Sequence, residues 1–261
     1  MRFGGGGFGG LGIGGILVLL VLSFIFKQDF LQLVSGTQGG TVESGPIEST
    51  PAEDSLKEFV TFVLNDAQEA WARVLPSQAN AEYQEARLVL FRDGVQSGCG
   101  DASSASGPFY CPVDQRVYLD LGFLNELHQR FGAPGDFAQA YVIAHEIGHH
   151  VQNQLGTAGQ VRQRAEQRPD QANQLSVRLE LQADCYAGLW AATTRERNLL
   201  DPGDIEEGLG AAAAVGDDRI QRAGGGAVNP ETWTHGSAEQ RAEWFRRGYS
   251  SGNLENCNTF R

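Results

Sequence analysis

A His-Glu-x-x-His pattern at residues 145–149 constrains the fold more strongly than any other feature. It lies in a segment, Phe137 to Gln154, whose apolar residues recur at helical spacing. On a helix, His145 and His149 project from the same face, close enough to bind one metal ion. Glu146 follows the first histidine, so its carboxylate can reach a water at the metal without being a ligand. This layout is typical of a zinc peptidase site, and a helix that merely carries two histidines is the alternative.

The residues that flank this helix predict its bounds. Asp136 is a good N-cap, and Gly156 stands where a helix commonly ends. His150 follows the second histidine, but successive helical residues are rotated by about 100°, so it is excluded as a ligand. The metal therefore needs its third ligand from another part of the chain.

A second predicted helix, from about Leu175 to Arg197, contains Glu180 and Asp184 one turn apart. A catalytic zinc takes three protein ligands and keeps one position open, which two histidines and one carboxylate satisfy. We expect Glu180 to complete the ligand set and Asp184 to accept the N–H on the far side of His145. Acidic residues among so many apolar ones are costly unless they are paired or bind metal, although an exposed acidic stripe is the alternative.

The overall composition is that of a globular protein, with 41% hydrophobic residues and a net charge of −12 at pH 7. The acidic balance, without a cluster of Lys and Arg, argues against nucleic acid as a partner and against electrostatic binding to an anionic membrane. The 261 residues suffice for one large domain or two small ones.

The four cysteines form no Cys-x-x-Cys pair, which argues against a structural zinc ribbon. Their even number and wide spacing are typical of two disulfides with three possible pairings, while reduced core cysteines are the alternative. Cys99 and Cys111 bound a loop of small residues, and a bond between them would stabilise the fold by about 3 kcal/mol in the chain-entropy model. If that bond forms, Cys185 and Cys257 pair by elimination.

The amino-terminal segment is uncharged from Phe3 to Phe26 and approaches the roughly 20 apolar residues that a membrane-crossing helix needs. No Ala-x-Ala-like cleavage site follows it, so we expect an uncleaved single-pass anchor over residues 1–34 rather than a signal peptide. Residues 35–54 are small and polar, which is typical of a flexible linker. Residues 55–261 then form the metal-site domain outside the cytoplasm, in a periplasmic or extracellular location.

The remaining patterns predict an α+β domain that is mainly helical and has a small mixed sheet. A long amphipathic helix starts at Asp54-Ser55 and is closed by Pro76, and strands are expected at residues 87–91 and 116–121. The second strand precedes the metal helix in the sequence. Residues Val117–Asp120 could equally be a core strand or an edge that pairs with an extended substrate.

Four further segments connect these elements. Residues 124–130 are predicted to be helical, with His128 on the surface. Residues 157–174 are predicted to be a mobile connection, a cleft rim or a lid. One Ala-rich helix is expected to run from Asp204 to Arg222, and another starts at Ser237 as its N-cap.

Several motifs together resemble those of known peptidase families. The pair His-Glu-x-x-His and Glu180-x-x-Ala-Asp184 resembles the gluzincin peptidases. Thr234-His235 followed by Arg241 is similar to a Thr-His-Pro…Arg segment of the membrane-bound CAAX-processing and HtpX-type peptidases, with glycine here replacing the proline. Combined with residues 107–112, these motifs resemble the bacterial, YpfJ-like family of "putative neutral zinc metallopeptidases", over roughly residues 50–261.

This resemblance implies a zincin-like fold and a peptidase activity that uses Zn²⁺, but it implies no particular substrate. It supports Glu180 as the third ligand. It also implies that His235 donates a hydrogen bond to the oxygen that gains negative charge during catalysis, a structural or surface histidine being the alternative. Only His235 and Arg241 of this chain match the CAAX-type segment, and Arg241 is expected to support the ligands.

The sequence therefore predicts a membrane-anchored zinc endopeptidase that faces outward and acts on peptide or protein substrates. His145, His149 and Glu180 would hold the metal, Glu146 would act as the general base, and Asp184 would orient His145. Two alternatives stay open. One is a zinc-stabilised binding or scaffold module, against which the presence of Glu146 argues, and the other is a zinc amidase acting on cell-wall peptides.

Overall fold

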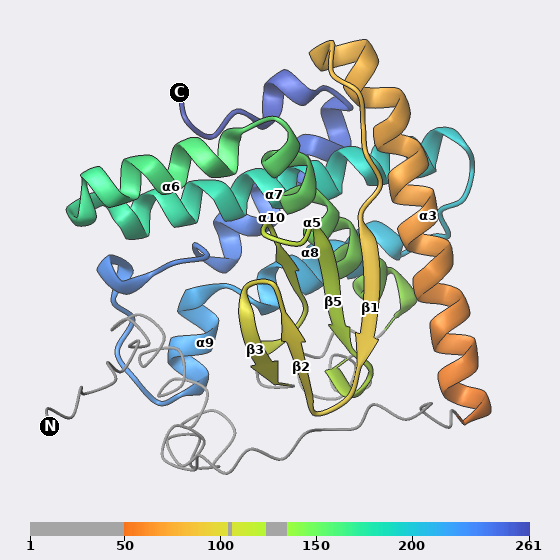
Figure 1. Cartoon of the computed structure of the whole chain (residues 1–261), viewed down its shortest axis with the longest axis horizontal. Coiled ribbons are helices and arrows are strands. Elements are labelled where there is room, and N and C mark those ends of the chain that lie inside the picture. Colours follow the sequence, from red (N-terminus) through yellow and green to blue (C-terminus); the bar gives the residue numbers. More distant parts are fainter. Residues whose placement is uncertain (1–49, 104–105, 124–134) are drawn as a thin grey trace, which may run out of the picture. The chain divides into compact units, whose positions relative to one another are not determined.

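The computed structural model describes residues 50–103, 106–123 and 135–261 (Figure 1). The chain divides into two compact units, and nearly all of the described residues belong to the larger one, Ser49–Arg222 with Ala227–Arg261. Of the smaller unit, only the end of one helix and the turn after it, Ala223–Gly226, are described. The expected anchor over residues 1–34 and the segment around His128 lie outside the described residues.

The described part of the chain is mainly helical with a small mixed sheet, as the sequence predicts. None of its helices is both long enough and apolar enough to span a membrane. The α-helices are α3 (Pro51–Ala79), α5 (Asp136–Gln154), α6 (Thr157–Gln167), α7 (Ala172–Glu196), α8 (Asp204–Ala214), α9 (Asp217–Ala223) and α10 (Ala238–Ser251). The strands are β1 (Arg87–Phe91), β2 (Gly94–Ser97), β3 (Gly100–Ser103), β4 (Phe109–Cys111) and β5 (Arg116–Asp120), and short 3-10 helices cover Pro169–Gln171, Pro230–Thr232 and Leu254–Cys257.

The main sheet has the strand order β1-β5-β4, with β5 parallel to β1 and antiparallel to β4. Strands β2 and β3 form a separate antiparallel pair. Because β5 has a partner on both sides, Val117–Asp120 is the centre of the sheet, and its alternative assignment as an edge is wrong. Among the described residues, β4 is the edge strand that contacts α5.

The core surrounds α5, which packs against α3, α7 and α8, while α10 packs along α7 (Figure 1). Glycines permit the closest approaches. A Cβ atom on Gly148 of α5 would lie 3.0 Å from the Ala183 carbonyl oxygen, and one on Gly248 of α10 would lie 1.9 Å from that of Cys185. Helix α7 is therefore held against α5 and α10 almost backbone to backbone, which fixes the level at which its side chains meet the two histidines.

Helix α3 differs from its predicted bounds at both ends. It begins at Pro51, before the predicted Asp54-Ser55, because Thr50 and Glu53 form a capping box and proline suits the first helical position. It also continues past Pro76 to Ala79. A proline so near the end removes only one N–H from the last turn, and Asn80 ends the helix in the left-handed conformation with φ of 50°.

Three other segments depart from the predictions. Gly135, with φ of 140°, occupies the N-cap of α5 and Asp136 is the first helical residue. Residues 157–174 contain helix α6, which agrees with their Gln, Arg and Ala content because these residues favour helix. The Ala-rich helix is divided into α8 and α9 at Gly216, where a Cβ atom would lie 2.3 Å from the Ala238 nitrogen of the next helix.

Candidate metal centre

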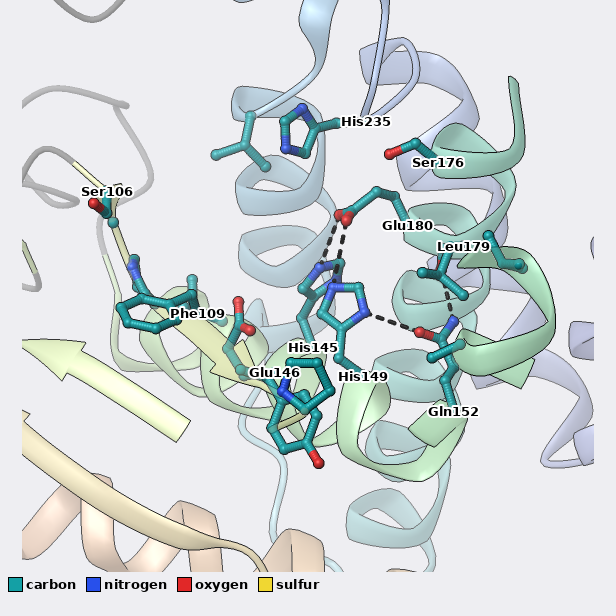
Figure 2. A pocket seen from close by; sticks show the side chains of 18 of the residues that line it. Ser106, Phe109, His145, Glu146, His149, Gln152, Ser176, Leu179, Glu180 and His235 are labelled. Atoms are coloured by element: carbon teal, nitrogen blue, oxygen red, sulfur yellow. Dashed lines mark hydrogen bonds and ion pairs between the residues drawn. The ribbon is translucent and has the colours of Figure 1, made fainter. Parts of the chain in front are cut away.

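The three predicted ligands meet at one point between α5 and α7 (Figure 2). The Nε2 atom of His145 lies 3.2 Å from Oε2 of Glu180, and Nε2 of His149 lies 3.5 Å from Oε1 of the same carboxylate. One donor atom from each of the three residues lies within 4.8 Å of the others. The four-residue step on α5 and the backbone approach of α7 together produce this cluster.

His145 is supported from behind by the carboxylate that the sequence indicates. Asp184 is fully buried, and its Oδ1 lies 2.9 Å from Nδ1 of His145. A carboxylate only accepts hydrogen bonds, so the Nδ1 of His145 donates to Asp184, and Nε2 is the nitrogen that faces Glu180 and could bind a metal.

Asp184 has two more buried partners. Arg241 of α10 donates from Nε to Oδ2 at 2.8 Å and from Nη2 to Oδ1 at 2.9 Å. The hydroxyl of Tyr141 donates to Oδ1 at 2.5 Å and accepts from Nη2 of Arg241 at 3.2 Å. Tyr141 was not predicted from the sequence as part of the site. Its position one turn before His145, on the same helical face, is the signal that could have identified it.

Charge dominates this part of the site. Burial alone would raise the pKa of Asp184, but the charges of Arg241 and His145 outweigh it and hold that pKa below its usual value. Burial likewise opposes protonation of His145, yet Asp184 and the hydrogen bond to Glu180 raise the pKa of His145 to about 9. The pKa of Glu180 is held well below its usual range, because the charge of His149 and the hydrogen bonds from both histidines outweigh its burial.

His149 is supported by an amide instead of a carboxylate. Its Nδ1 lies 2.9 Å from Oε1 of Gln152, which is fully buried one turn further along α5 (Figure 2). The sequence analysis did not identify Gln152, because glutamine at this spacing is common on helices and carries no distinct pattern.

A cavity of about 620 Å³ opens beside the three ligands. The carboxylate of Glu146 lines it and forms no hydrogen bond or ion pair with another described residue (Figure 2). Strand β4 and the residues before it form one wall of the cavity, and α6 with the start of α7 forms the opposite wall. The lining residues from these walls are mostly apolar: Gly107, Pro108, Phe109, Tyr110, Pro112, Ala158, Val161, Ala165, Ala172 and Leu179.

His235 also lines this cavity, above Glu180 in Figure 2. Asp217, the first residue of α9, holds it in place. One carboxylate oxygen of Asp217 accepts from the backbone N–H groups of residues 234–236 at 2.7–3.0 Å, and the other lies 3.2 Å from Nδ1 of His235. The His235 side chain is about half exposed. Its partial desolvation opposes protonation, but the hydrogen bond to Asp217 and the charge of Glu180 raise its pKa. No sequence spacing connected Asp217 to this site.

His150 is absent from the cluster, as its helical angle predicts. It is fully buried, and its Nε2 donates to the carbonyl oxygen of Gln84 at 2.6 Å while its Nδ1 accepts from the Tyr110 hydroxyl at 2.9 Å. These bonds attach α5 to β4 and to the chain before β1. His150 is therefore a structural residue.

The structure contains the two disulfides that the sequence analysis favoured. Cys99–Cys111 attaches the β2–β3 pair to β4, and Cys185–Cys257 attaches the carboxyl-terminal segment to α7. Cys185 directly follows Asp184, so the second disulfide attaches the carboxyl-terminal segment to the helix that carries Glu180 and Asp184.

The cluster fits zinc by the chemistry of its donors. Two imidazole nitrogens and one carboxylate are the ligand set of many catalytic zinc sites, which leave a fourth position open. In both histidines Nδ1 donates to an acceptor, so Nε2 is the nitrogen that can give its lone pair to a metal ion. The fourth position would open toward the cavity and Glu146.

Comparisons with known proteins agree with this chemistry. A family model described as "Putative neutral zinc metallopeptidase" matches residues 1–260. The chain is 43% identical over 253 residues to "Uncharacterized protein YpfJ" of Escherichia coli K12, covering 95% of this chain and 87% of that protein. It is 48% identical over 207 residues to "Uncharacterized protein Rv2575" of Mycobacterium tuberculosis H37Rv, covering 75% of this chain and 68% of that protein. No solved structure matches the chain.

Proposed function

The chain belongs to the family described as "Putative neutral zinc metallopeptidase", and from that premise we propose that it is a zinc-dependent endopeptidase. The observation that carries the proposal is the convergence of His145, His149 and Glu180 beside a cavity lined by Glu146, which has no partner among the described residues. A site that only stabilised the fold would be closed by a fourth protein ligand and would have no use for this carboxylate.

A zincin-like fold is part of the proposal. Its support is the arrangement of the elements: one helix carries both histidines, the next long helix carries the glutamate, and a small mixed sheet has its edge strand at the cavity. His145 and Glu180 also share one buried neighbour, because Arg241 is bonded to Asp184 behind His145 and lies 4.0 Å from Glu180.

The proposed chemistry assigns the proton transfers to Glu146. Zinc, when bound, polarises a water molecule and lowers its pKa to about 7. Glu146 takes a proton from the attacking water on its carboxylate and delivers it to the amine nitrogen that leaves. Such general acid–base catalysis contributes a factor of about 10²–10⁴ to the rate.

His235 is proposed to stabilise the carbonyl oxygen of the peptide bond as negative charge develops on it. Its Nδ1 is engaged by Asp217, which leaves Nε2 as the donor for the cavity. Asp217 acts by fixing the ring, since three backbone N–H groups hold its carboxylate in turn.

The substrate is proposed to be an extended peptide or protein segment lying along β4. The residues from Gly107 to Tyr110 line the cavity, and β4 pairs with β5 on one side only among the described strands. Main-chain hydrogen bonds to such an edge bind many sequences. The apolar lining of the opposite wall favours apolar side chains next to the cleaved bond.

Replacing Glu146 by Gln tests the proposal. The full chain in detergent should contain one zinc per molecule by elemental analysis, and Glu146→Gln should keep that zinc while peptide cleavage falls by about 10²–10⁴-fold. Glu243→Gln, which changes an exposed ion pair with Arg247 on α10, is the matched control and should cleave normally.

The readout is a digest of a broad peptide library, analysed by mass spectrometry. Internal cuts that Glu146→Gln abolishes support the endopeptidase. Zinc without any cut would favour a zinc-stabilised binding module, and cuts confined to cell-wall peptides would favour an amidase. Full cleavage by Glu146→Gln would refute the assigned base.

We further propose that residues 1–34 anchor the chain in a membrane with the metal-site domain outside the cytoplasm. Two observations support this: the uncharged stretch from Phe3 to Phe26, and the two disulfides, which persist in oxidising compartments.

Cell fractionation with thiol alkylation tests this location. The full chain should remain in the membrane fraction after alkaline extraction and expose no alkylatable thiol. Deletion of residues 1–34 should leave a soluble chain with reduced, alkylatable cysteines. Full-length chain in the soluble fraction with free thiols would contradict the anchor.

A further inference from the structure

Gln152 lies behind His149 in the position that Asp184 occupies behind His145. We propose that Gln152 is a positioning residue for the second metal ligand, and that it is held in turn by Gln182 and the disulfide-bound carboxyl-terminal segment, Leu254–Thr259. This inference rests on the proposed zinc site. It adds a structural link between that site and the Cys185–Cys257 disulfide.

The orientation of the Gln152 amide follows from its partners. One end of the amide lies 2.7 Å from the carbonyl oxygen of Leu179, which can only accept, so this end is the NH₂ group. The oxygen must then face His149, at 2.9 Å. His149 therefore donates from Nδ1, which leaves Nε2 as the nitrogen that would bind the proposed metal.

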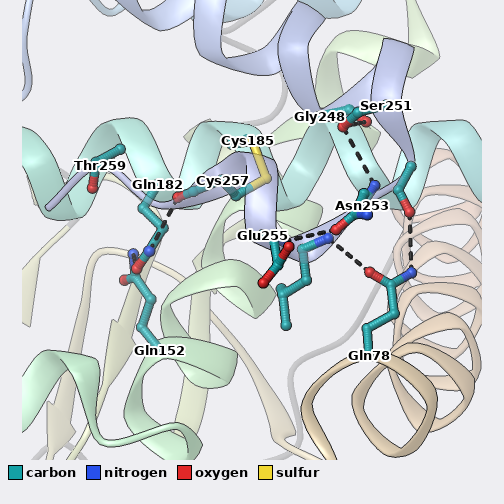
Figure 3. The surroundings of a disulfide bond; sticks show 12 residues. Gln78, Gln152, Gln182, Cys185, Gly248, Ser251, Asn253, Glu255, Cys257 and Thr259 are labelled. Atoms are coloured by element: carbon teal, nitrogen blue, oxygen red, sulfur yellow. Dashed lines mark hydrogen bonds between the residues drawn. A yellow bond between two sulfur atoms is a disulfide. The ribbon is translucent and has the colours of Figure 1, made fainter. Parts of the chain in front are cut away.

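The chain of hydrogen bonds continues beyond Gln152 with the same direction. Nε2 of Gln152 also lies 3.2 Å from Oε1 of Gln182, and Nε2 of Gln182 donates to the carbonyl oxygen of Cys257 at 3.1 Å (Figure 3). Each amide accepts at one end and donates at the other. The backbone carbonyls of Leu179 and Cys257 thus determine which nitrogen of His149 carries the proton.

The carboxyl-terminal segment is held firmly enough to serve as the end of this series of hydrogen bonds. Cys257 is fully buried and bonded to Cys185 of α7 (Figure 3). The hydroxyl of Thr259 donates to the carbonyl oxygen of Arg178 at 2.7 Å. The disulfide and this hydrogen bond attach the segment to α7 on both sides of Gln182.

Burial makes this series of hydrogen bonds sensitive to substitution. Gln152 is fully buried and Gln182 is 5% exposed, so water cannot replace a lost partner of either amide. An apolar side chain at position 152 would leave the ring of His149 without an acceptor. The ring would then be free to rotate or to change its tautomer, and either change removes the lone pair from the metal.

Isosteric Gln-to-Met substitutions test the inference. Gln152→Met should weaken zinc binding by about 10–100-fold, measured by chelator competition on the full chain, because the ligand loses its outer-shell acceptor. It should also change the visible d–d absorption of the Co²⁺-loaded protein, which reports the geometry of the ligands. Gln182→Met should act in the same direction with a smaller effect.

Gln154→Met is the matched control. Gln154 lies on the same helix, and its amide donates to the carbonyl oxygen of Gln84 at 2.5 Å, but it contacts no proposed metal ligand. This variant should bind zinc and cobalt as the unaltered chain does. Far-UV circular dichroism shows whether each variant is folded, and if Gln152→Met does not fold, Gln182→Met decides the question.

The outcomes separate this inference from the proposed function. Equal zinc affinity and an unchanged cobalt spectrum in Gln152→Met, or in Gln182→Met where that variant decides, would overturn the inference alone. An equal loss in Gln154→Met would also overturn it, because the effect would then belong to the helix in general. Absence of zinc from the unaltered chain would overturn the metal site and this inference with it.

Discussion

The two histidines that face Glu180 are supported from behind by opposite kinds of group. His145 donates to Asp184, a buried carboxylate that also accepts two bonds from Arg241 and one from Tyr141. His149 donates to Gln152, a neutral amide that belongs to a chain of amides. The first support depends on balanced charge, and the second depends on the geometry of packed backbone carbonyls.

The difference follows from the charge that a zinc site can carry. With zinc bound, the charges of Glu180, Asp184 and Arg241 leave the centre with one net positive charge, which favours polarisation of a water molecule. A second supporting carboxylate at position 152 would remove that charge. It would also lie buried without a cation among its hydrogen-bond partners, which is costly. A neutral acceptor orients the ring of His149 without either consequence.

The largest effect on stability is expected from breaking the ion pair between Asp184 and Arg241. Arg241→Leu leaves the carboxylate of Asp184 buried without its guanidinium partner, and loss of one partner of a buried pair costs about 3–5 kcal/mol. The measurement is urea unfolding of the metal-free chain, followed by tryptophan fluorescence. A loss below about 1 kcal/mol would show that charge balance is not what holds this side of the site.

Tyr141→Phe is a milder variant of the same network and serves as its control. It removes one hydrogen bond to Asp184 and keeps the ion pair with Arg241. The expected loss is about 1.5–3 kcal/mol, the usual contribution of a hydrogen bond to a charged group. If Tyr141→Phe destabilised the chain as much as Arg241→Leu, packing rather than charge would explain both.

The charged support of His145 also predicts that the stability of the metal-free chain depends on pH. The pKa of His145 rises from 6.5 to about 9 on folding, so its stabilising contribution is complete below pH 6.5 and is lost as the pH rises through 9. The free energy of unfolding should fall by up to about 3 kcal/mol across this window. Urea titrations at pH 6, 7.5 and 9.5 measure the change.

The same urea titrations on Gln152→Met distinguish the support of His145 by Asp184 from the support of His149 by Gln152. Gln152 is neutral, so the substitution should leave the fall in stability between pH 6.5 and 9 in place, while lowering zinc affinity in the separate binding assay. A flat pH profile in Gln152→Met would mean that the amide, rather than Asp184, sets the protonation of the histidine pair.

Much of the site could be predicted because its parts are local. The step from His145 to His149 and the step from Glu180 to Asp184 are each one helical turn, so helical periodicity alone places each pair on one face. The same periodicity correctly excluded His150. The mainly helical class with a small mixed sheet likewise followed from local patterns.

The errors are of two kinds. The strand at residues 116–120 was a possible substrate edge until pairing with β1 and β4 placed it in the centre of the sheet. Strand order depends on which strands pair, and a local pattern does not contain that information. Pro76 was expected to end α3, yet the helix continues to Ala79, and its ends are set locally by the capping box of Thr50 and Glu53 and by Asn80.

The sequence by itself thus determined which side chains share a helical face, because His145 with His149 and Glu180 with Asp184 are each one turn apart. Only the tertiary structure decided which further side chains hold the site in place. Tyr141, Gln152 and Asp217 act through partners 18 to 100 residues away. The contacts of Tyr141 and Gln152 exist because glycines let α7 approach α5 and α10 closely enough for buried polar groups to meet, and burial makes those pairings necessary.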